Sequence, residues 1–221
     1  MIDKWTRKYM KLAKALADDN TACYSRKIGV VLISKNNDPI GFGYNGSITK
    51  SPHNDDPAYL AHIWKNILTD KQREHLVEKY DLKENKDNPS YHFFTKNRLL
   101  ITQIDGMGKS FVDKFSGCET CPRKLLNIPS GESMDICNCS HAERNAIFNA
   151  AKSGASTIDA HIYCFCGTPC HECSIAIVQS GIKNVTCLKT DAPDYSKSSR
   201  GLLQMAGVNL NIIDAKDIFN E

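Results

Sequence analysis

The chain of 221 residues lacks any long apolar run. The longest strongly apolar stretch, residues 28–33, has six residues, whereas a membrane-spanning helix needs about 20. The first eight residues contain no apolar core and no small-residue cleavage site, so we expect no secretory signal and a cytoplasmic location. Apolar residues make up 41% and charged residues 24%, which argues against a disordered chain.

The chain also lacks a strong excess of either charge, because 28 basic and 25 acidic residues leave a formal net charge of +3. That balance permits an anionic small molecule as a ligand, but it lacks the basic bias of a dedicated nucleic-acid-binding protein. We therefore expect neither a membrane nor a nucleic acid among the partners.

Cysteine is the residue type in excess, with ten in the chain. Nine of them lie between positions 118 and 187, mostly in pairs separated by one or two residues. Disulfides are disfavoured in the reducing cytoplasm, and bridges between such near neighbours would be strained. Thiols at these separations can instead converge on a metal ion, so we expect metal binding.

The order of the expected elements predicts an α/β protein. We expect one domain over residues 1–221, with an insertion of short elements at about 83–136. An amphipathic helix begins near Trp5 and ends near residues 18–20, and residues 56–80 are also expected to be helical. From residue 141 helices and strands alternate, which indicates a partly parallel sheet covered by helices. The expected strands are 28–33, 40–44, 160–166, 184–189 and 208–213, and the later helices are 141–153, 169–181 and 197–206.

Two segments carry the candidate chemistry, Ser-His-Ala-Glu at 140–143 and Pro-Cys-His-Glu-Cys at 169–173. Each is expected to open a helix, where unpaired backbone N–H groups and the helix dipole favour thiolates. His141, Cys170 and Cys173 would give zinc three protein ligands and leave the fourth position for water. Zinc lowers the pKa of such a water from about 15.7 to about 7. Glu143 would then take a proton from the water and return it to a departing amine.

Each segment also has a simpler interpretation. Ser140 and Glu143 match a capping box, in which the glutamate only satisfies the start of a helix. Cys170 and Cys173 match a redox pair or half of a structural zinc site. The two segments together favour the catalytic interpretation, because His-x-Glu followed by Pro-Cys-x-x-Cys is the signature of zinc-dependent nucleobase deaminases.

Several further segments extend this likeness beyond the metal ligands. They are the strand at 25–31, Gly-Tyr-Asn-Gly at 43–46, the two zinc helices at 139–151 and 169–182, and the C-terminal segments 194–195 and 202–208. Through them the chain resembles the deoxycytidylate (dCMP) deaminases, of the phage type, within the zinc-dependent cytidine/deoxycytidylate deaminase superfamily. The resemblance covers roughly residues 2–50 and 137–213.

The resemblance implies a cytidine-deaminase-like three-layer α/β/α sandwich around a mixed, roughly five-stranded sheet. It implies hydrolysis of dCMP to dUMP and ammonia, feeding thymidylate synthesis, in the host cytoplasm if the chain is phage-encoded. Asn45 would bind the sugar, and Arg26 and Tyr195 would bind the 5′-phosphate. Asn45 followed by Gly46 is also a strong signal for a type I′ hairpin turn, and the two roles are compatible.

The family is commonly hexameric, activated by dCTP and inhibited by dTTP. The loop after Asn45 would hold this regulatory site, with Asn54 and Asp55 binding sugar hydroxyls or a magnesium-bound triphosphate. This chain lacks the glycine-cysteine pair that the family often has in that loop, and a solvated acidic turn is the alternative interpretation.

The segment before His141 adds four cysteines to the chain. Four thiolates would close a tetrahedral structural zinc site and hold this insertion together. We therefore predict a second zinc ion. Its expected ligands are Cys118, Cys121, Cys137 and Cys139.

Other functions remain open at this stage. One is a deaminase of another cytosine nucleoside or nucleotide, or of adenosine in tRNA, although the last needs a basic and aromatic surface. Another is a zinc-stabilised binding module without activity. Glu143 argues against the binding module, because a structural zinc site needs no carboxylate beside it.

Overall fold

The computed structural model describes residues 2–21, 23, 26–47, 66–80, 92–95, 98–101, 123, 128–129, 132, 136–190 and 196–219. The chain forms two compact units, Met1–Gly46 together with Ser140–Glu221, and Ser47–Cys139. This division does not decide whether the second unit is an insertion into one domain, so our expectation of a single domain stays a prediction. None of the described helices is both long and apolar enough to cross a membrane.

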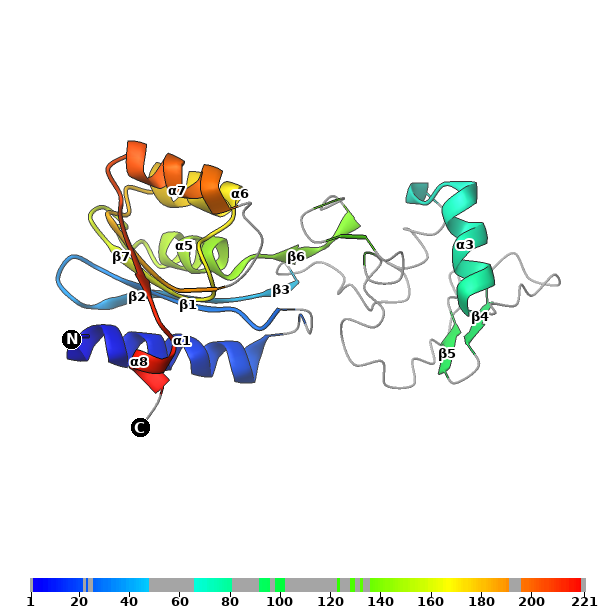
Figure 1. Ribbon diagram of the computed structural model, residues 1–221, viewed down its shortest axis with the longest axis horizontal. Helices are drawn as coiled ribbons and strands as arrows, with labels where there is room; N and C mark the ends of the chain where they lie inside the picture. The colour runs from blue at the N-terminus through cyan, green and yellow to red at the C-terminus, as the bar shows by residue number, and fades with distance from the viewer. Residues whose placement is uncertain are drawn as a thin grey trace. The chain divides into compact units, whose positions relative to one another are not determined.

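A five-stranded mixed sheet forms the centre of the first unit (Figure 1). Its order is β2-β1-β7-β8-β9. The strands are β1 (Gly29–Ile33), β2 (Pro39–Tyr44), β7 (His161–Phe165), β8 (Asn184–Leu188) and β9 (Asn209–Ile213). β1 is antiparallel to both β2 and β7, whereas β7, β8 and β9 are parallel. The expected α/β class and the mixed sheet are confirmed.

Helices cover both faces of this sheet, so that it is the middle layer of three (Figure 1). α1 (Lys4–Asn20) and the short α8 (Lys216–Phe219) lie on one face, and α5 (Ala142–Lys152), α6 (His171–Gln179) and α7 (Ser196–Met205) on the other. Alternate residues of β1 point to opposite faces. Val30 and Leu32 pack in the core with α5 and α6, whereas Val31 and Ile33 pack in the core with α1. The apolar run predicted as a buried strand is therefore buried on both faces.

Two glycines allow helices to lie directly on the strand backbones. A Cβ atom on Gly29 would stand 2.0 Å from the Ala13 carbonyl oxygen of α1, and one on Gly43 would stand 2.0 Å from the Ala142 carbonyl oxygen of α5. Real Cβ atoms do not approach other atoms so closely, so any side chain would force the helix away. Gly43 therefore sets where the first turn of α5 lies on β2.

α1 begins at a well-formed cap and ends where the sequence predicts. The Asp3 carboxylate accepts hydrogen bonds from the backbone N–H groups of Trp5, at 2.9 Å, and Thr6, at 3.0 Å, and a further bond from the Thr6 hydroxyl. These bonds, led by that of the hydroxyl, lower the pKa of Asp3.

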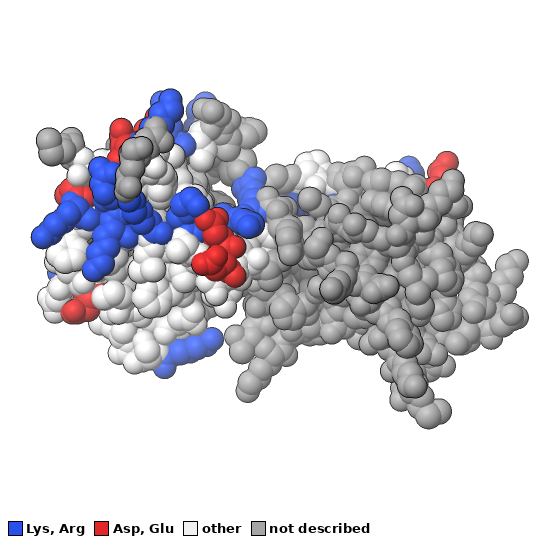
Figure 2. Space-filling view, turned by 90° about the horizontal axis from the view of Figure 1, so that it is seen from below, with Lys and Arg blue, Asp and Glu red and all other residues white. Residues whose placement is uncertain are grey.

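The outer side of α1 is rich in cations, at Lys4, Arg7, Lys8, Lys11 and Lys14. Lys and Arg side chains gather on this side of the first unit (Figure 2). Because α1 and α5 cover opposite faces of the sheet, these cations do not line the start of α5.

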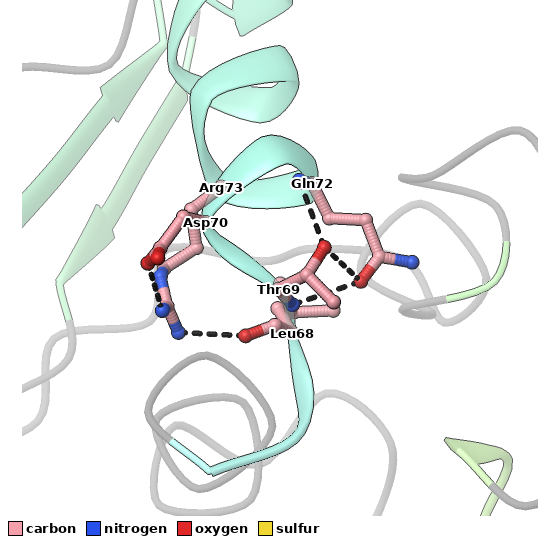
Figure 3. A network of polar contacts seen from close by, with 5 residues as sticks. All are labelled: Leu68, Thr69, Asp70, Gln72 and Arg73. Carbon is pink, nitrogen blue, oxygen red and sulfur yellow. Dashed lines mark hydrogen bonds and ion pairs between the residues drawn. The ribbon is translucent and has the colours of Figure 1, made fainter.

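The helix predicted over residues 56–80 is interrupted within the part that the structure describes. Within its described part, residues 66–80, the α-helix is α3 (Asp70–Tyr80), and Leu68 and Thr69 are not helical. Thr69 and Gln72 form a capping box (Figure 3): the Gln72 amide oxygen accepts from the Thr69 N–H at 2.9 Å, and the Thr69 hydroxyl accepts from the Gln72 N–H at 3.3 Å. The prediction was wrong at Leu68 and Thr69, because it rested on the spacing of apolar residues, which does not reveal this capping box.

The remaining described elements are short. β4 (His92–Thr95) and β5 (Arg98–Ile101) form an antiparallel pair in the second unit. β3 (Gly46–Ser47) and β6 (Cys139–Ser140) pair in a two-stranded sheet. The helices and strands that the sequence predicts for the first unit are present with boundary shifts of one to two residues, whereas α8 was not predicted.

Candidate active site

The starts of two helices bring three possible metal ligands together. His141 is the N-cap of α5, Cys170 is the N-cap of α6, and Cys173 lies in the first turn of α6. The His141 Nδ1 atom lies 3.3 Å from the Cys170 Sγ atom and 3.4 Å from the Cys173 Sγ atom. Neither side chain is held in a capping hydrogen bond, so both are available to the cluster.

The donor set fits a zinc ion. Tetrahedral coordination, with Zn–S distances of about 2.3 Å and Zn–N distances of about 2.0 Å, separates a nitrogen from a sulfur ligand by about 3.6 Å. The two observed nitrogen–sulfur distances are close to this value. In the part of the chain that the structure describes, these three residues are the only cluster of three or more possible ligands. Three ligands leave one tetrahedral position for a group from outside the chain.

Electrostatics in the cluster favour the deprotonated form of one of the two sulfur ligands, Cys170. The pKa of Cys170 is lowered to about 4, chiefly because the Cys173 thiol donates a hydrogen bond to the thiolate, with a further contribution from His141. The same contact with Cys170 raises the pKa of His141. The hydrogen bond between the two cysteines raises the pKa of Cys173, so of the two only Cys170 is favoured as a thiolate without a metal.

Glu143 lies in the first turn of α5 and is only 3% exposed. Burial raises the pKa of its carboxyl group. The Oε1 atom accepts a weak hydrogen bond from the Cys166 thiol, at 3.9 Å, whereas the buried Oε2 atom has no hydrogen-bond partner among the described residues. Such an oxygen is suited to exchange a proton with a bound molecule. The capping-box interpretation is wrong, because α5 is capped at His141 and not at Ser140.

Cys166 is a neighbour of the site that our sequence reasoning did not identify. Besides contacting Glu143, its thiol donates to the Gly167 carbonyl oxygen at 3.2 Å. A hydrogen bond with Cys164 and burial raise the pKa of Cys166 well above its usual value, so it stays a thiol. The Cys-x-Cys spacing at 164–166 was the available signal, but spacing alone does not show which face of β7 approaches Glu143.

Asn45 directly follows β2 and lies against the first residue of α5, next to the possible metal ligand His141. Its side chain is buried, its Oδ1 atom accepts from the Ala142 N–H at 2.9 Å, and its Nδ2 atom donates to the Arg26 carbonyl oxygen at 3.3 Å. A type I′ turn needs positive φ at both central residues. Neither Asn45 nor Gly46 has one, so that interpretation is wrong. Sugar binding by Asn45 stays a prediction.

The other expected site residues are less informative. The Arg26 side chain is exposed and stays a predicted phosphate ligand. Cys137 and Cys139 are half-buried at the entry to β6. Their expected partners lie outside the described residues, so the second zinc site stays a prediction. Those partners are Cys118 and Cys121. The predicted nucleotide ligands outside the described residues are Tyr195, Asn54 and Asp55.

Comparison with known sequences agrees with this arrangement of residues. A family model described as the cytidine and deoxycytidylate deaminase zinc-binding region matches residues 3–189. The chain is 27% identical over 198 residues to the deoxycytidylate deaminase of Enterobacteria phage T2, covering 88% of this chain and 85% of that protein. It is 35% identical over 115 residues to the deoxycytidylate deaminase of Schizosaccharomyces pombe, which covers 52% of this chain. The aligned part spans about a third of that yeast relative and of the one from Saccharomyces cerevisiae.

Among solved structures, the chain is similar to the dCMP deaminase of cyanophage S-TIM5, crystallised in complex with dCMP and dUMP. The TM-score is 0.52 at 19% identity, and the match covers 96% of this chain and 99% of the other. At this level of identity the likeness shows that the two chains share a fold.

Proposed function

Because the chain belongs to the cytidine and deoxycytidylate deaminase family, we propose that it is a zinc-dependent enzyme that hydrolyses dCMP to dUMP and ammonia. The observation that carries the proposal is the meeting of His141, Cys170 and Cys173 beside the buried Glu143. The choice of dCMP is supported by the phage T2 relative, which bears that activity in its name and aligns over most of both chains.

In the proposed reaction, His141 Nδ1 and the sulfurs of Cys170 and Cys173 hold the metal. When bound, zinc supplies the Lewis acidity that makes water a nucleophile near neutral pH. The water oxygen forms a bond to C4 of the cytosine ring, and the bond from C4 to the amino nitrogen breaks. Glu143 Oε2 takes a proton from the water and passes it to that nitrogen, which leaves as ammonia, and the second proton of the water ends on the ring nitrogen N3 of dUMP.

Asn45 is the proposed contact to the sugar, and Arg26 and Tyr195 are the proposed contacts to the phosphate. An asparagine amide carries two N–H donors and two acceptor lone pairs. The bonds to Ala142 and Arg26 use one donor and one acceptor of Asn45, which leaves capacity for a sugar hydroxyl group. Arg26 would supply the positive charge that a monophosphate needs.

The resemblance also supports regulation and assembly as parts of the proposal. The enzyme would be a homohexamer that dCTP activates and dTTP inhibits, with a magnesium-bound nucleotide near Asn54 and Asp55. Its product would feed thymidylate synthesis.

The experiment is a comparison of substrates with purified protein. We expect ammonia release from dCMP with a kcat/KM about tenfold or more above that for deoxycytidine, because charge-assisted phosphate contacts contribute about 1.5–3 kcal/mol. CMP, dCTP and tRNA complete the panel. Equal rates for dCMP and deoxycytidine would contradict the phosphate contacts, and activity on tRNA alone would contradict the proposed substrate.

Two variants separate the activity of this site from a contaminating deaminase. Glu143→Gln should keep its zinc and lose activity by about 10²–10⁴-fold, which is the usual contribution of a general acid–base group. Glu74→Gln changes an exposed glutamate of α3 and should keep full activity. A Glu143→Gln protein that remains active would contradict the proton transfer assigned to this residue.

A further inference from the structure

Two asparagines one turn apart on α5 hydrogen-bond to the backbone of β2. The Nδ2 atom of Asn145 donates to the Tyr44 carbonyl oxygen, and the Nδ2 atom of Asn149 donates to the Phe42 carbonyl oxygen, both at 2.8 Å. β2 is at the edge of the five-stranded sheet, where carbonyl groups on the outer side have no partner strand. The two amides thus satisfy alternate carbonyl groups of this edge.

Only the bond from Asn145 lies next to the candidate active site. Tyr44 directly precedes Asn45, and the Asn145 Nδ2 atom also lies 3.5 Å from the carbonyl oxygen of Ser140, the residue before His141. Asn45 accepts from the N–H of Ala142, the residue after His141. Two asparagine amides therefore hold the backbone on both sides of this metal ligand, whereas Asn149 bonds one turn farther along α5.

The packing of α5 on β2 gives these bonds a role in alignment. Gly41 and Gly43 present no side chain to α5, and the residues of α5 that face them, Ala146 and Ala142, are small and fully buried. Between these glycines and alanines no large side chains interlock, so this part of the contact does little to oppose sliding. The close approach at Gly43 sets how near α5 lies to β2, and the directional hydrogen bonds restrain its position along the strand.

We propose that Asn145 is a positioning residue of the active site. It ties the end of β2 to the start of α5 and so keeps Asn45, His141 and Glu143 in one arrangement. The role in zinc retention follows from the hydrogen bonds alone, whereas the role in turnover rests on the proposed function. Misplacement of a reacting group by about 1 Å can lower a rate about 100-fold, so loss of this bond has a measurable effect.

The test compares matched variants, Asn145→Ala with Asn149→Ala, because each removes one 2.8 Å bond from α5 to β2. We expect similar small losses of thermal stability in both. Only Asn145→Ala should lower kcat for dCMP, by about tenfold or more, and release zinc to a chelator about tenfold faster than wild type. Asn145→Asp and Asn149→Asp form a second pair, which keeps the side-chain shape and removes the donor, and should show the same contrast.

The outcomes separate this inference from the proposed function. If both members of a pair change kcat and zinc release equally, or neither member changes them, Asn145 has no special role and the inference fails. If the wild-type protein does not deaminate dCMP, the proposed function fails, while the rates of zinc release still decide the role of Asn145.

Discussion

His161 is a half-buried histidine of β7 that lies on the α1 side of the sheet. Its ring stacks on Tyr163, with centroids 3.9 Å apart, and its Nε2 atom lies 2.8 Å from the Thr186 hydroxyl oxygen. Burial lowers the pKa of His161 to about 4, and the Asp3 carboxylate only partly opposes this effect. The residue is therefore neutral and packs beside the core, which agrees with its position in an apolar strand.

This environment predicts a pH dependence of stability. Between pH values of about 6.5 and 4 the unfolded chain binds a proton at His161 that the folded chain does not, so the free energy of unfolding falls as the pH falls. The contribution of this residue between pH 7 and pH 5 is about 2 kcal/mol. Urea unfolding at both values checks it: His161→Gln should reduce the difference by about this amount.

The matched control is His75→Gln, which changes an exposed histidine of α3. It should leave the pH dependence of unfolding of the first unit as in wild type. An unchanged slope in His161→Gln would mean that this histidine is not the group that titrates.

At the scale of elements, the site depends on how closely α5 approaches β2. Ala142 and Ala146 are fully buried against Gly41 and Gly43, and the same turn of α5 carries Glu143. A displacement of this helix would therefore move the proton-transfer group together with the His141 cap. Packing of the first turn and chemistry at the site cannot change independently.

Gly43→Ala tests this coupling. The added methyl group would meet the Ala142 carbonyl oxygen at 2.0 Å, so α5 must shift, at a cost of about 1–3 kcal/mol of unfolding free energy. We expect lower stability in urea unfolding together with lower deaminase activity. The control is Gly201→Ala in α7, where the new methyl group meets nothing within 4 Å. That change should stabilise the protein by about 0.5–1 kcal/mol, since it removes a glycine from a helix interior.

A Gly43→Ala protein with wild-type stability would show that α5 can shift at no cost. One that loses stability but keeps full activity would show that the site does not depend on the contact.

At the scale of the whole molecule, the cysteines predict two zinc ions per chain. One is expected at His141, Cys170 and Cys173, and the other at the four cysteines Cys118, Cys121, Cys137 and Cys139. Elemental analysis of the purified protein should find about two zinc ions per chain, since four thiolates form a closed site. Removal of zinc by a chelator should lower the midpoint of thermal unfolding, because binding to the folded state stabilises it.

Two variants distinguish the two metal ions. Cys118→Ser should lower the zinc content to about one per chain, because a closed site loses one of its four ligands. Cys173→Ser should also lower the zinc content to about one, but it should abolish activity. A wild-type content of one zinc per chain would rule out the second site.

Much of the candidate site could be predicted from the sequence, because its groups lie at helix starts with short motif spacings. His141, Glu143, Cys170 and Cys173 were identified in this way, and the structure brings the three possible ligands together. Cys166 and Asn145 were not assigned a role, because their importance lies in contacts across 23 and 101 positions of the chain. Asn45 was noticed, but its bond to the Ala142 N–H, across 97 positions, has no local signal.

The sequence by itself determined the α/β class, the amphipathic α1, the buried β1 and the alternation of helices and strands after residue 141. These features depend on hydrophobic periodicity and on capping within a few residues, which are local properties of a chain. Only the tertiary structure decided the order β2-β1-β7-β8-β9, the approach of α5 to Gly43 and the burial of Glu143 with an unpartnered oxygen. They depend on which surfaces pack together after distant segments meet, and the pattern of neighbouring residues does not contain that information.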